Sequence, residues 1–497
     1  MTLEGKITWD FLKNISDTIN SYRVRAFIDA KDDILNAGIY NESSYYNILF
    51  KMFEEEQLKY SLFRYLKSQE KSNLDSLKQF STLNSIELKK TLFIVYMLKH
   101  EKLIEIVEVL DEMDDENMQS KPNIFKDLLI TCYKGDITKV RTVYEPTEVI
   151  FRSKVCSGCG ICSGICPMNC ITLNNGFGII NDEKCIRCGL CYLVCPRSFL
   201  PLKALYMYQD NTDDIKEYGK VGPFLEAYAA QTKVPGIKTV CQDGGITSTC
   251  LYYLFEQDLI NIAIGAKTSE EQWRPEPFLM EKKEDVIKAA GTKYVNSPNL
   301  QLINDNKILQ HNIAVVGVPC QMQALLKSKV YDTGFPSLAH ISYRIGIFCM
   351  ESFQYDGFLE ICEKLNVDVN DVKKTDINKG KFFIYTLTGE ELSIPIKEIS
   401  NLAREDCKVC YDLTSESADI SIGSIGAPSG WNIVLIRTQK GKELYHKLIK
   451  HDLIESKNIE DVKPGLSMLQ KIAGTKRNTC QKHIDGKKKK NERYPIY

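Results

Sequence analysis

The stretch CSGCGICSGICP at residues 156–167 is followed by a second copy of the same pattern, CIRCGLCYLVCP, at residues 185–196. In each copy three cysteines are separated by two residues, and a fourth cysteine, followed by proline, comes three residues later. This is the spacing with which bacterial-type ferredoxins bind two 4Fe–4S clusters. Structural zinc sites use four tetrahedral ligands, usually a C-x2-C pair and a distant second pair, so two complete copies ending in proline favour iron–sulfur ligation.

The two copies are expected to exchange their fourth ligands. A two-residue step lets a tight loop direct three thiolates at one cluster, whereas the fourth cysteine lies beyond the loop and reaches the other cluster. Glycines at positions 158, 160 and 189 relieve backbone crowding in these loops. Cys170 is left over, and we interpret it as a bystander. The first cluster is thus predicted to bind Cys156, Cys159, Cys162 and Cys195, and the second Cys185, Cys188, Cys191 and Cys166.

The overall composition is that of an ordinary globular chain inside a cell. Its length of 497 residues is enough for about three domains. The net charge of -1 gives no reason to expect nucleic acid or an anionic membrane as a partner. No apolar run approaches the ~20 residues of a membrane span, and the N-terminus has no apolar signal core, so we expect a cytoplasmic protein. Without an export signal, 18 cysteines favour metal ligation over disulfides.

The composition and the apolar pattern of the sequence change twice along the chain. Residues 1–145 contain one cysteine, and apolar residues at helical spacing predict helices at 44–69 and 86–100. The second of these helices and the β-like residues that follow it suit a winged-helix domain; a helical docking domain is the alternative. Residues 146–205 hold nine cysteines and form the ferredoxin module. From about residue 220 the pattern predicts an α/β or α+β fold.

The α/β region is expected to be one flavin-binding domain in two halves, 206–300 and 301–460. Strand-like runs at 260–265, 313–318 and 344–348 alternate with helical stretches. Thr388 and Gly389 predict a hairpin turn between strands at 381–387 and 391–396. Residues 461–497 end in a run of lysines, Lys487–Lys490, and are assigned to a solvated basic tail.

Two glycine-containing turns in the α/β region indicate cofactor binding. The first, Asp243-Gly244-Gly245, precedes a helix that starts with hydroxyl residues, and such a start offers backbone amides to a phosphate. The same residues also make a common turn. The second follows a strand at 419–423 and lacks the complete dinucleotide fingerprint. The candidate cofactor-binding residues are Asp243, Gly244, Gly245, Thr247, Ser248, Gly423 and Gly426.

Four further cysteines form a possible third ligand set: Cys320, Cys349, Cys407 and Cys410. Two of them follow strand-like runs, where the site residues of α/β sheets lie. The alternative is a set of buried apolar cysteines with one chance C-x2-C. Their spacing alone does not decide between the two interpretations.

Six stretches, taken in order, resemble the β-subunit family of coenzyme F420 hydrogenases and dehydrogenases. The similarity covers residues 150–445, and the ferredoxin module directly before it is similar to that of the reduced-coenzyme F420 dehydrogenase input subunit. Residues 1–145 depart from this pattern. The matching stretches are Gln242-Asp-Gly-Gly-Ile-Thr-Ser, Ala290-Gly-Thr-Lys-Tyr, Val316-Gly-Val-Pro-Cys-Gln, Ile347-Phe-Cys-Met-Glu-Ser-Phe, Arg404-Glu-Asp-Cys-Lys-Val-Cys-Tyr-Asp and Ala418-Asp-Ile-Ser-Ile-Gly-Ser-Ile-Gly.

The resemblance implies FAD, coenzyme F420 as substrate and a cluster near the flavin, which favours the third-cluster interpretation. A deazaflavin carries a hydride and a cluster accepts one electron at a time, so FAD, which does both, belongs between them. Electrons are expected to pass to ferredoxin or a partner protein, and a peripheral place on a membrane complex stays open. Lys293 is the one catalytic candidate, as a donor to the flavin ring or phosphate; an ordinary surface lysine is the alternative.

Two other functions stay open. One is a flavin and iron–sulfur reductase of the same fold that acts on another substrate. The other is a redox-responsive regulator in which residues 1–145 bind DNA; the near-neutral charge and the lack of an obvious basic recognition helix argue against it.

The paired motif predicts the metal content of the protein. Anaerobically purified protein should contain at least about eight iron atoms and a matching amount of acid-labile sulfide per chain, because each complete motif supports one 4Fe–4S cluster. Zinc without labile sulfide, in the same metal and sulfide analysis, would contradict the iron–sulfur interpretation.

Overall fold

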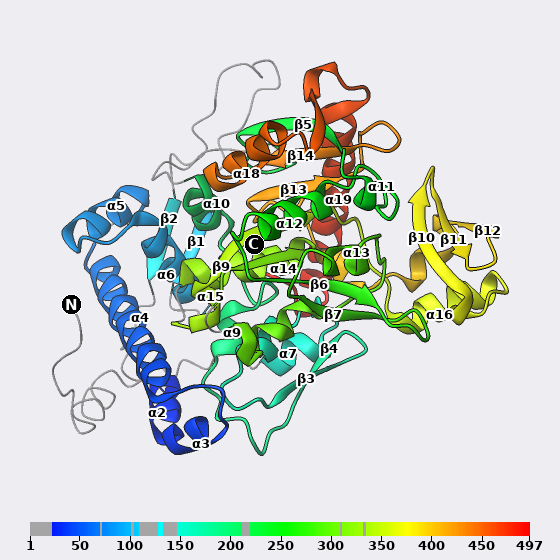
Figure 1. Ribbon diagram of the computed structural model, residues 1–497. Coiled ribbons are helices and arrows are strands. Elements are labelled where there is room, and N and C mark those ends of the chain that lie inside the picture. Colours follow the sequence, from blue (N-terminus) through cyan, green and yellow to red (C-terminus); the bar gives the residue numbers. More distant parts are fainter. Residues whose placement is uncertain are drawn as a thin grey trace.

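The computed structural model describes residues 22–69, 72–100, 104–108, 128–132, 147–210, 219–308, 311–331 and 334–497. An eight-stranded mixed sheet forms its centre (Figure 1). The order across this sheet is β15 (Ile454–Asn458), β5 (Glu226–Thr232), β14 (Asn432–Ile436), β13 (Ile420–Gly423), β9 (Ile341–Ile347), β8 (Ile313–Gly317), β6 (Ile262–Thr268) and β7 (Pro275–Met280).

Four neighbouring strands at the middle of the sheet, β13, β9, β8 and β6, run parallel. Such strands are buried on both faces and read as nearly continuous apolar runs, which is why the strands at 260–265, 313–318 and 344–348 were predictable; all three are confirmed. Helices α12 (Ile246–Glu256) and α18 (Gln439–Lys450) pack on one face, and α14 (Pro319–Tyr331) and α19 (Gly465–Lys489) on the other. Both predicted halves contribute strands to this one sheet, since β5, which belongs to the first half, lies between β15 and β14 of the second.

A second, three-stranded sheet stands at the far edge of the domain (Figure 1). It consists of β10 (Val372–Asn378), β11 (Lys381–Thr386) and β12 (Glu391–Pro395), and it packs on α16 (Tyr355–Lys364) through Phe358, Phe382 and Ile384. Strands β11 and β12 pair antiparallel, and Gly389 between them has a φ of 91° that favours glycine. The predicted hairpin is confirmed.

The ferredoxin module has two similar halves. In the first, α8 (Ile161–Gly164) follows a cysteine loop and leads to the paired strands β3 (Ile171–Asn174) and β4 (Phe177–Ile180). In the second, α9 (Leu190–Val194) follows the other cysteine loop and leads to α10 (Leu202–Asp210). Both short helices begin after a glycine with positive φ, Gly160 at 91° and Gly189 at 71°. Helix α7 (Thr147–Arg152) precedes the first loop.

The described part of residues 1–145 is mostly helical, as predicted. The elements are α2 (Tyr22–Asp29), α3 (Lys31–Asn36), α4 (Glu42–Ser68), α5 (Leu74–Leu83), α6 (Leu88–His100), β1 (Ile104–Glu108) and β2 (Leu128–Cys132), with β1 and β2 antiparallel. Helices followed by a strand pair match the order expected of a winged-helix domain. However, every residue of α6 whose burial is described, except Lys90, is buried, and Phe93 packs on Phe199 and Tyr331. This helix is therefore not available to a nucleic-acid groove.

These N-terminal helices do not close a core of their own within the described residues. Val24, Ile48 and Met52 share one buried cluster with Ile161 and Leu190 of the ferredoxin module. A second cluster joins α4, α5 and α6 to residues of the ferredoxin module. Instead of enclosing a separate core, the described N-terminal helices thus share two buried clusters with the ferredoxin module.

The prediction of a solvated tail at 461–497 is wrong. Residues 465–489 form α19, whose Leu469, Ala473 and Cys480 are buried. The chain end packs between the ferredoxin module and the α/β domain, where the Tyr497 hydroxyl donates to the Val409 carbonyl at 2.6 Å. The many lysines of α19 obscure the spacing of its apolar residues in the sequence. Within the final lysine run only Lys488–Lys490 are exposed. Within the described residues no helix is long and apolar enough to cross a membrane.

The shared core makes a prediction for Phe93→Ala. This substitution should lower the free energy of unfolding by about 3–5 kcal/mol, because it leaves a cavity between α6, Phe199 and Tyr331. Loss of helical circular dichroism and loss of the visible cluster absorbance should shift together to lower temperature. Leu83→Ala is the matched control, since Leu83 is 68% exposed. An unchanged cluster transition in Phe93→Ala would mean that the N-terminal helices unfold independently.

Candidate functional site

The charges that act on two of the ferredoxin thiols agree with the predicted division into two ligand sets. The thiol of Cys159 is influenced by the charges of Cys156 and Cys195, and that of Cys188 by Cys166 and Cys185. None of the eight is in a disulfide. Burial raises the pKa of Cys159 to about 12, so this thiolate needs a compensating positive charge such as iron. Ligation itself stays a prediction.

The surroundings of these cysteines fit iron–sulfur clusters. Backbone amides donate to the sulfurs of Cys156, Cys166 and Cys195, each at 3.4 Å, as expected for ligand thiolates. Within the described ranges no three Cys, His, Asp or Glu side chains are grouped closely enough for a single metal ion. A 4Fe–4S cluster requires a wider spacing between its ligand side chains, because its four ligands bind four different iron atoms.

The two cysteine loops differ in their exposure. The first, residues 156–162, is entirely buried against the α/β domain: the amide of Leu300 donates to the Cys159 carbonyl at 3.1 Å and Asn296 Nδ2 to the Ser157 carbonyl at 2.9 Å. The second lies nearer the surface, with Cys185 partly exposed. Helix α2 covers part of it, where Arg23 Nε donates to the Cys188 carbonyl at 3.0 Å. The first cluster position therefore faces inward and the second faces outward.

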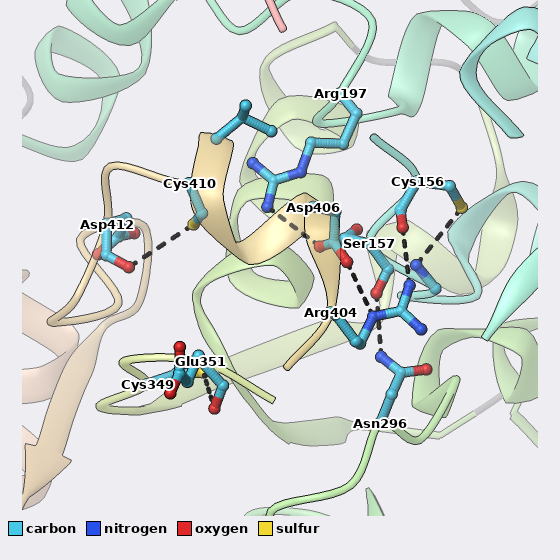
Figure 2. Close-up of polar contacts among 12 residues, drawn as sticks. Cys156, Ser157, Arg197, Asn296, Cys349, Glu351, Arg404, Asp406, Cys410 and Asp412 are labelled. Atoms are coloured by element: carbon cyan, nitrogen blue, oxygen red, sulfur yellow. Dashed lines mark hydrogen bonds and ion pairs between the residues drawn. The ribbon is translucent and has the colours of Figure 1, made fainter. Parts of the chain in front are cut away.

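A chain of buried charges joins the first loop to the α/β domain (Figure 2). Arg404 Nη2 donates to the carbonyls of Cys156 at 2.8 Å and Gly176 at 3.0 Å, and Arg404 Nε binds Asp406 at 2.8 Å. Asp406 also pairs with Arg197 of the ferredoxin module at 3.7 Å. All three charged side chains are at most 4% exposed. Arg404 begins one of the six family-like stretches, but the sequence did not reveal its anchoring role.

The four remaining candidate cysteines come together at one edge of the central sheet. Cys320 follows β8 in the first turn of α14, and Cys349 follows β9. Cys407 and Cys410 belong to the short helix η6 (Glu405–Val409) and its end. Since β8 and β9 are parallel, their carboxyl ends meet at the same edge, which explains why distant cysteines converge. Cys410 electrostatically influences the other three thiols.

Two buried cations compensate this third cysteine group. Lys476 of α19 is 4% exposed and donates to the Cys349 carbonyl at 2.5 Å. Burial opposes its charge, yet the nearby Cys410, Cys349 and Cys407 leave the pKa of Lys476 raised. Arg197 lies near Cys410 and Cys320, and its buried Nε has no hydrogen-bond partner among the described residues. Fixed positive charge and a free N–H donor fit an anionic cluster.

Sequence reasoning missed Lys476 because it placed this residue in a solvated tail. Cys480, one turn further along α19, also lies near Cys410 and is a fifth cysteine of the neighbourhood. The apolar periodicity of Leu469, Ala473 and Cys480 was the only signal in the sequence that could have revealed the buried face of this helix.

The two glycine turns predicted to bind a cofactor lie next to each other. Burial raises the pKa of Asp243, and a hydrogen bond with Ser424 from the second turn opposes this shift. A Cβ added at Gly244 would lie 2.5 Å from the Ala230 carbonyl, and one at Gly426 would clash with the Gly465 carbonyl. These glycines are thus required by the packing of the protein itself. Valine substitutions there would disturb the fold and would not test phosphate binding.

The remaining predicted residues differ in their surroundings. Thr247 and Ser248 lie partly exposed in the first turn of α12. Directly before the first glycine turn, the two polar side-chain atoms of Gln242 are buried without a partner among the described residues. Tyr294 lies within electrostatic range of Asp376, Asp243 and Cys349, whose charges raise its pKa after the larger effect of burial. Tyr294 thus links the first glycine turn to the third cysteine group, and Gln242 before that turn has unsatisfied polar atoms. This donor set fits a flavin.

Lys293 is not an ordinary surface lysine. Its ammonium donates to three carbonyls, Ala289 at 2.5 Å and Ala290 and Gly291 at 3.0 Å each, at the end of α13 (Asp285–Ala289). Burial lowers its pKa to about 8. Because an ammonium has three donors, a bond to flavin would require it to release one carbonyl. Its catalytic role stays a prediction.

Comparison with known proteins gives three family matches in order along the chain. Residues 148–214 match the 4Fe-4S dicluster domain. Residues 227–304 match the coenzyme F420 hydrogenase/dehydrogenase beta subunit N-terminal domain. Residues 310–462 match the C-terminal domain of the same beta subunit.

Individual relatives agree with these matches. The coenzyme F420 hydrogenase subunit beta of Methanococcus voltae is 38% identical over 53% of this chain and 95% of its own length. An F(420)H(2) dehydrogenase subunit of Methanosarcina mazei is 36% identical over 67% of this chain and 93% of its own length. A chain in a solved structure of the F420-reducing NiFe hydrogenase complex from Methanosarcina barkeri is 34% identical, with a TM-score of 0.54, and covers 56% of this chain and 98% of that one. The inward-facing cluster loop, the third cysteine group and the glycine turns lie in the matched ranges, and the chain belongs to the coenzyme F420 hydrogenase/dehydrogenase beta-subunit family of oxidoreductases.

Proposed function

We propose that this protein transfers a hydride between coenzyme F420 and FAD and passes single electrons between FAD and a series of 4Fe–4S clusters. The order would be FAD, the third cysteine group, the first ferredoxin cluster and the second. Ferredoxin or a partner subunit would exchange electrons with the second cluster. The names of the relatives support the substrate, since they are coenzyme F420 hydrogenase and dehydrogenase subunits.

The observation that carries this proposal is that successive sites lie within electrostatic range of one another. Tyr294 lies near both Asp243 and Cys349, which links the glycine turns to the third cysteine group. Cys320 in turn lies near Cys159 of the first ferredoxin group. The Cys162 thiol is influenced by Cys191 of the second group. Residues of each proposed carrier site thus lie within electrostatic range of the next site, which suits a chain of single-electron carriers.

The third cysteine group would hold a cluster through Cys320, Cys349, Cys407 and Cys410. Lys476 and Arg197 would stabilise the negative charge that an added electron brings, because both are cations held in a buried site. FAD supplies the conversion between a hydride and single electrons. The chain's contribution is to hold the flavin between the substrate and Cys349 and to exclude water.

The N-terminal helices would shape the surface at which the electron partner docks. Helix α2 lies on the outward-facing loop through the bond between Arg23 and the Cys188 carbonyl. Tyr40, just before α4, donates to the Ile165 carbonyl at 3.3 Å, behind the same cluster position. A partner that docks beside Cys188 would therefore also meet these helices. A DNA-binding regulator is disfavoured, because α6 is buried.

Anaerobic mixing with reduced coenzyme F420 tests the activity. With a dye as electron acceptor, the absorbance of the oxidised coenzyme should appear at many times the rate of the same mixture without protein, and heat-released flavin should be FAD. A reduced nicotinamide is the control donor. Oxidation of the nicotinamide but not of the deazaflavin would favour a flavin and iron–sulfur reductase with another substrate.

Cys407→Ser and Cys410→Ser test the third cluster. Each variant should lose about four iron atoms per chain, while the paramagnetic signals of the two ferredoxin clusters remain. Cys362→Ala is the control, because Cys362 is 3% exposed in the apolar core around α16, away from the cysteine groups. Full iron content in both serine variants would show that these cysteines hold no cluster.

A further inference from the structure

Cys170 lies against the sulfurs assigned to the second cluster. Its Sγ is 3.4 Å from Cys166 Sγ, and its thiol is also within hydrogen-bonding reach of Cys185. The side chain is 5% exposed. Since Cys166 and Cys185 both belong to the second ligand set, Cys170 is not the bystander that the sequence indicated. It is a fifth thiol at a site that needs four.

A tight turn brings Cys170 back to Cys166. The amide of Asn169 donates to the Cys166 carbonyl at 3.1 Å, and Asn169 adopts a left-handed φ of 48°. The amide of Cys170 then donates to Cys166 Sγ at 3.4 Å. Both cysteine side chains therefore leave the turn on the same side, and β3 begins immediately afterwards.

We propose that Cys170 is a reserve ligand of the second cluster, able to take the coordination position of Cys166. A sulfur 3.4 Å from a ligand sulfur reaches the same iron atom by a change of side-chain rotamer and a small adjustment of the turn. In the exchange, the iron–sulfur bond of Cys166 breaks and that of Cys170 forms. The Cys170 thiol releases its proton, the freed Cys166 thiolate takes one up, and neither the charge nor the oxidation state of the cluster changes.

The first cluster has no equivalent residue. The position four residues after Cys195 is occupied by Phe199, whereas the position four residues after Cys166 is Cys170. The ring of Phe199 packs on Phe93 at 5.7 Å between centroids and lies 3.6 Å from Lys327 Nζ. The reserve thiol thus accompanies the outward-facing cluster.

The two halves of the module provide a matched experiment on the full chain. After anaerobic reconstitution, Cys166→Ala should keep the iron and sulfide content of the unsubstituted protein, whereas Cys195→Ala should lose about four iron atoms per chain. The double variant Cys166→Ala/Cys170→Ala should lose the same amount as Cys195→Ala. Cys170→Ala alone should keep all its iron. Equal iron loss in Cys166→Ala and Cys195→Ala would overturn the reserve role.

Serine variants control for the possibility that an alanine variant loses iron because it misfolds, since serine has nearly the same volume as cysteine. In resonance Raman spectra, Cys166→Ser should show coordination of the second cluster by cysteine sulfur alone, and Cys195→Ser an oxygen ligand on the first. An oxygen ligand in Cys166→Ser would overturn the proposal. The reserve role rests on the ligand sets of the proposed function: if Cys195→Ala and the double variant both keep full iron, those sets are wrong and the reserve role falls with them.

Discussion

The buried guanidinium of Arg404 is the contact on which the arrangement of this protein depends. It binds the Cys156 and Gly176 carbonyls of the ferredoxin module and the Asp406 carboxylate of the α/β domain. Its Nη1 has no hydrogen-bond partner among the described residues. Burying a charge costs several kcal/mol, and removing one partner of a buried pair costs about 3–5 kcal/mol. Asp406 is shared with Arg197 from the other side, so the two modules hold each other in one relative position. Electron transfer between fixed carriers requires such a rigid junction.

This junction orients the ferredoxin module. Because Arg404 and Asn296 bind the first loop, that loop turns toward the third cysteine group and the second loop turns outward. The buried cations also lie on this inward side of the ferredoxin module. Arg197 and Lys476 surround the third group, where a buried cluster would otherwise carry uncompensated negative charge. On the outward loop, Arg23 of α2 binds the backbone beside the ligand position at Cys188.

Segments far apart in the chain complete this interior. Helix α19 supplies Lys476, and the chain end at Tyr497 binds both the Val409 carbonyl and Arg197, at 2.6 Å and 2.8 Å. The N-terminal helices share their apolar core with the cysteine loops. The cluster sites are thus built from the first described helix to the last residue, although the cysteines themselves fall in two short stretches and four isolated positions.

The sequence by itself determined the parts of this protein whose signal is local. Cysteine spacing identified two cluster motifs, apolar runs located the parallel strands, and Thr388-Gly389 located a hairpin, because each of these depends on residues within about one element of each other. Tertiary structure decided the rest. Lys476 looked like part of a solvated tail until α19 packed on the sheet, and Lys293 proved to bind three carbonyls at a helix end. Cys170 reads as a spare residue in the sequence, and only the turn after Cys166 places its sulfur beside a ligand. Such contacts form when the folded backbone brings together residues that are distant in the sequence or that lie on either side of a tight turn. The spacing of residues along the sequence does not reveal them.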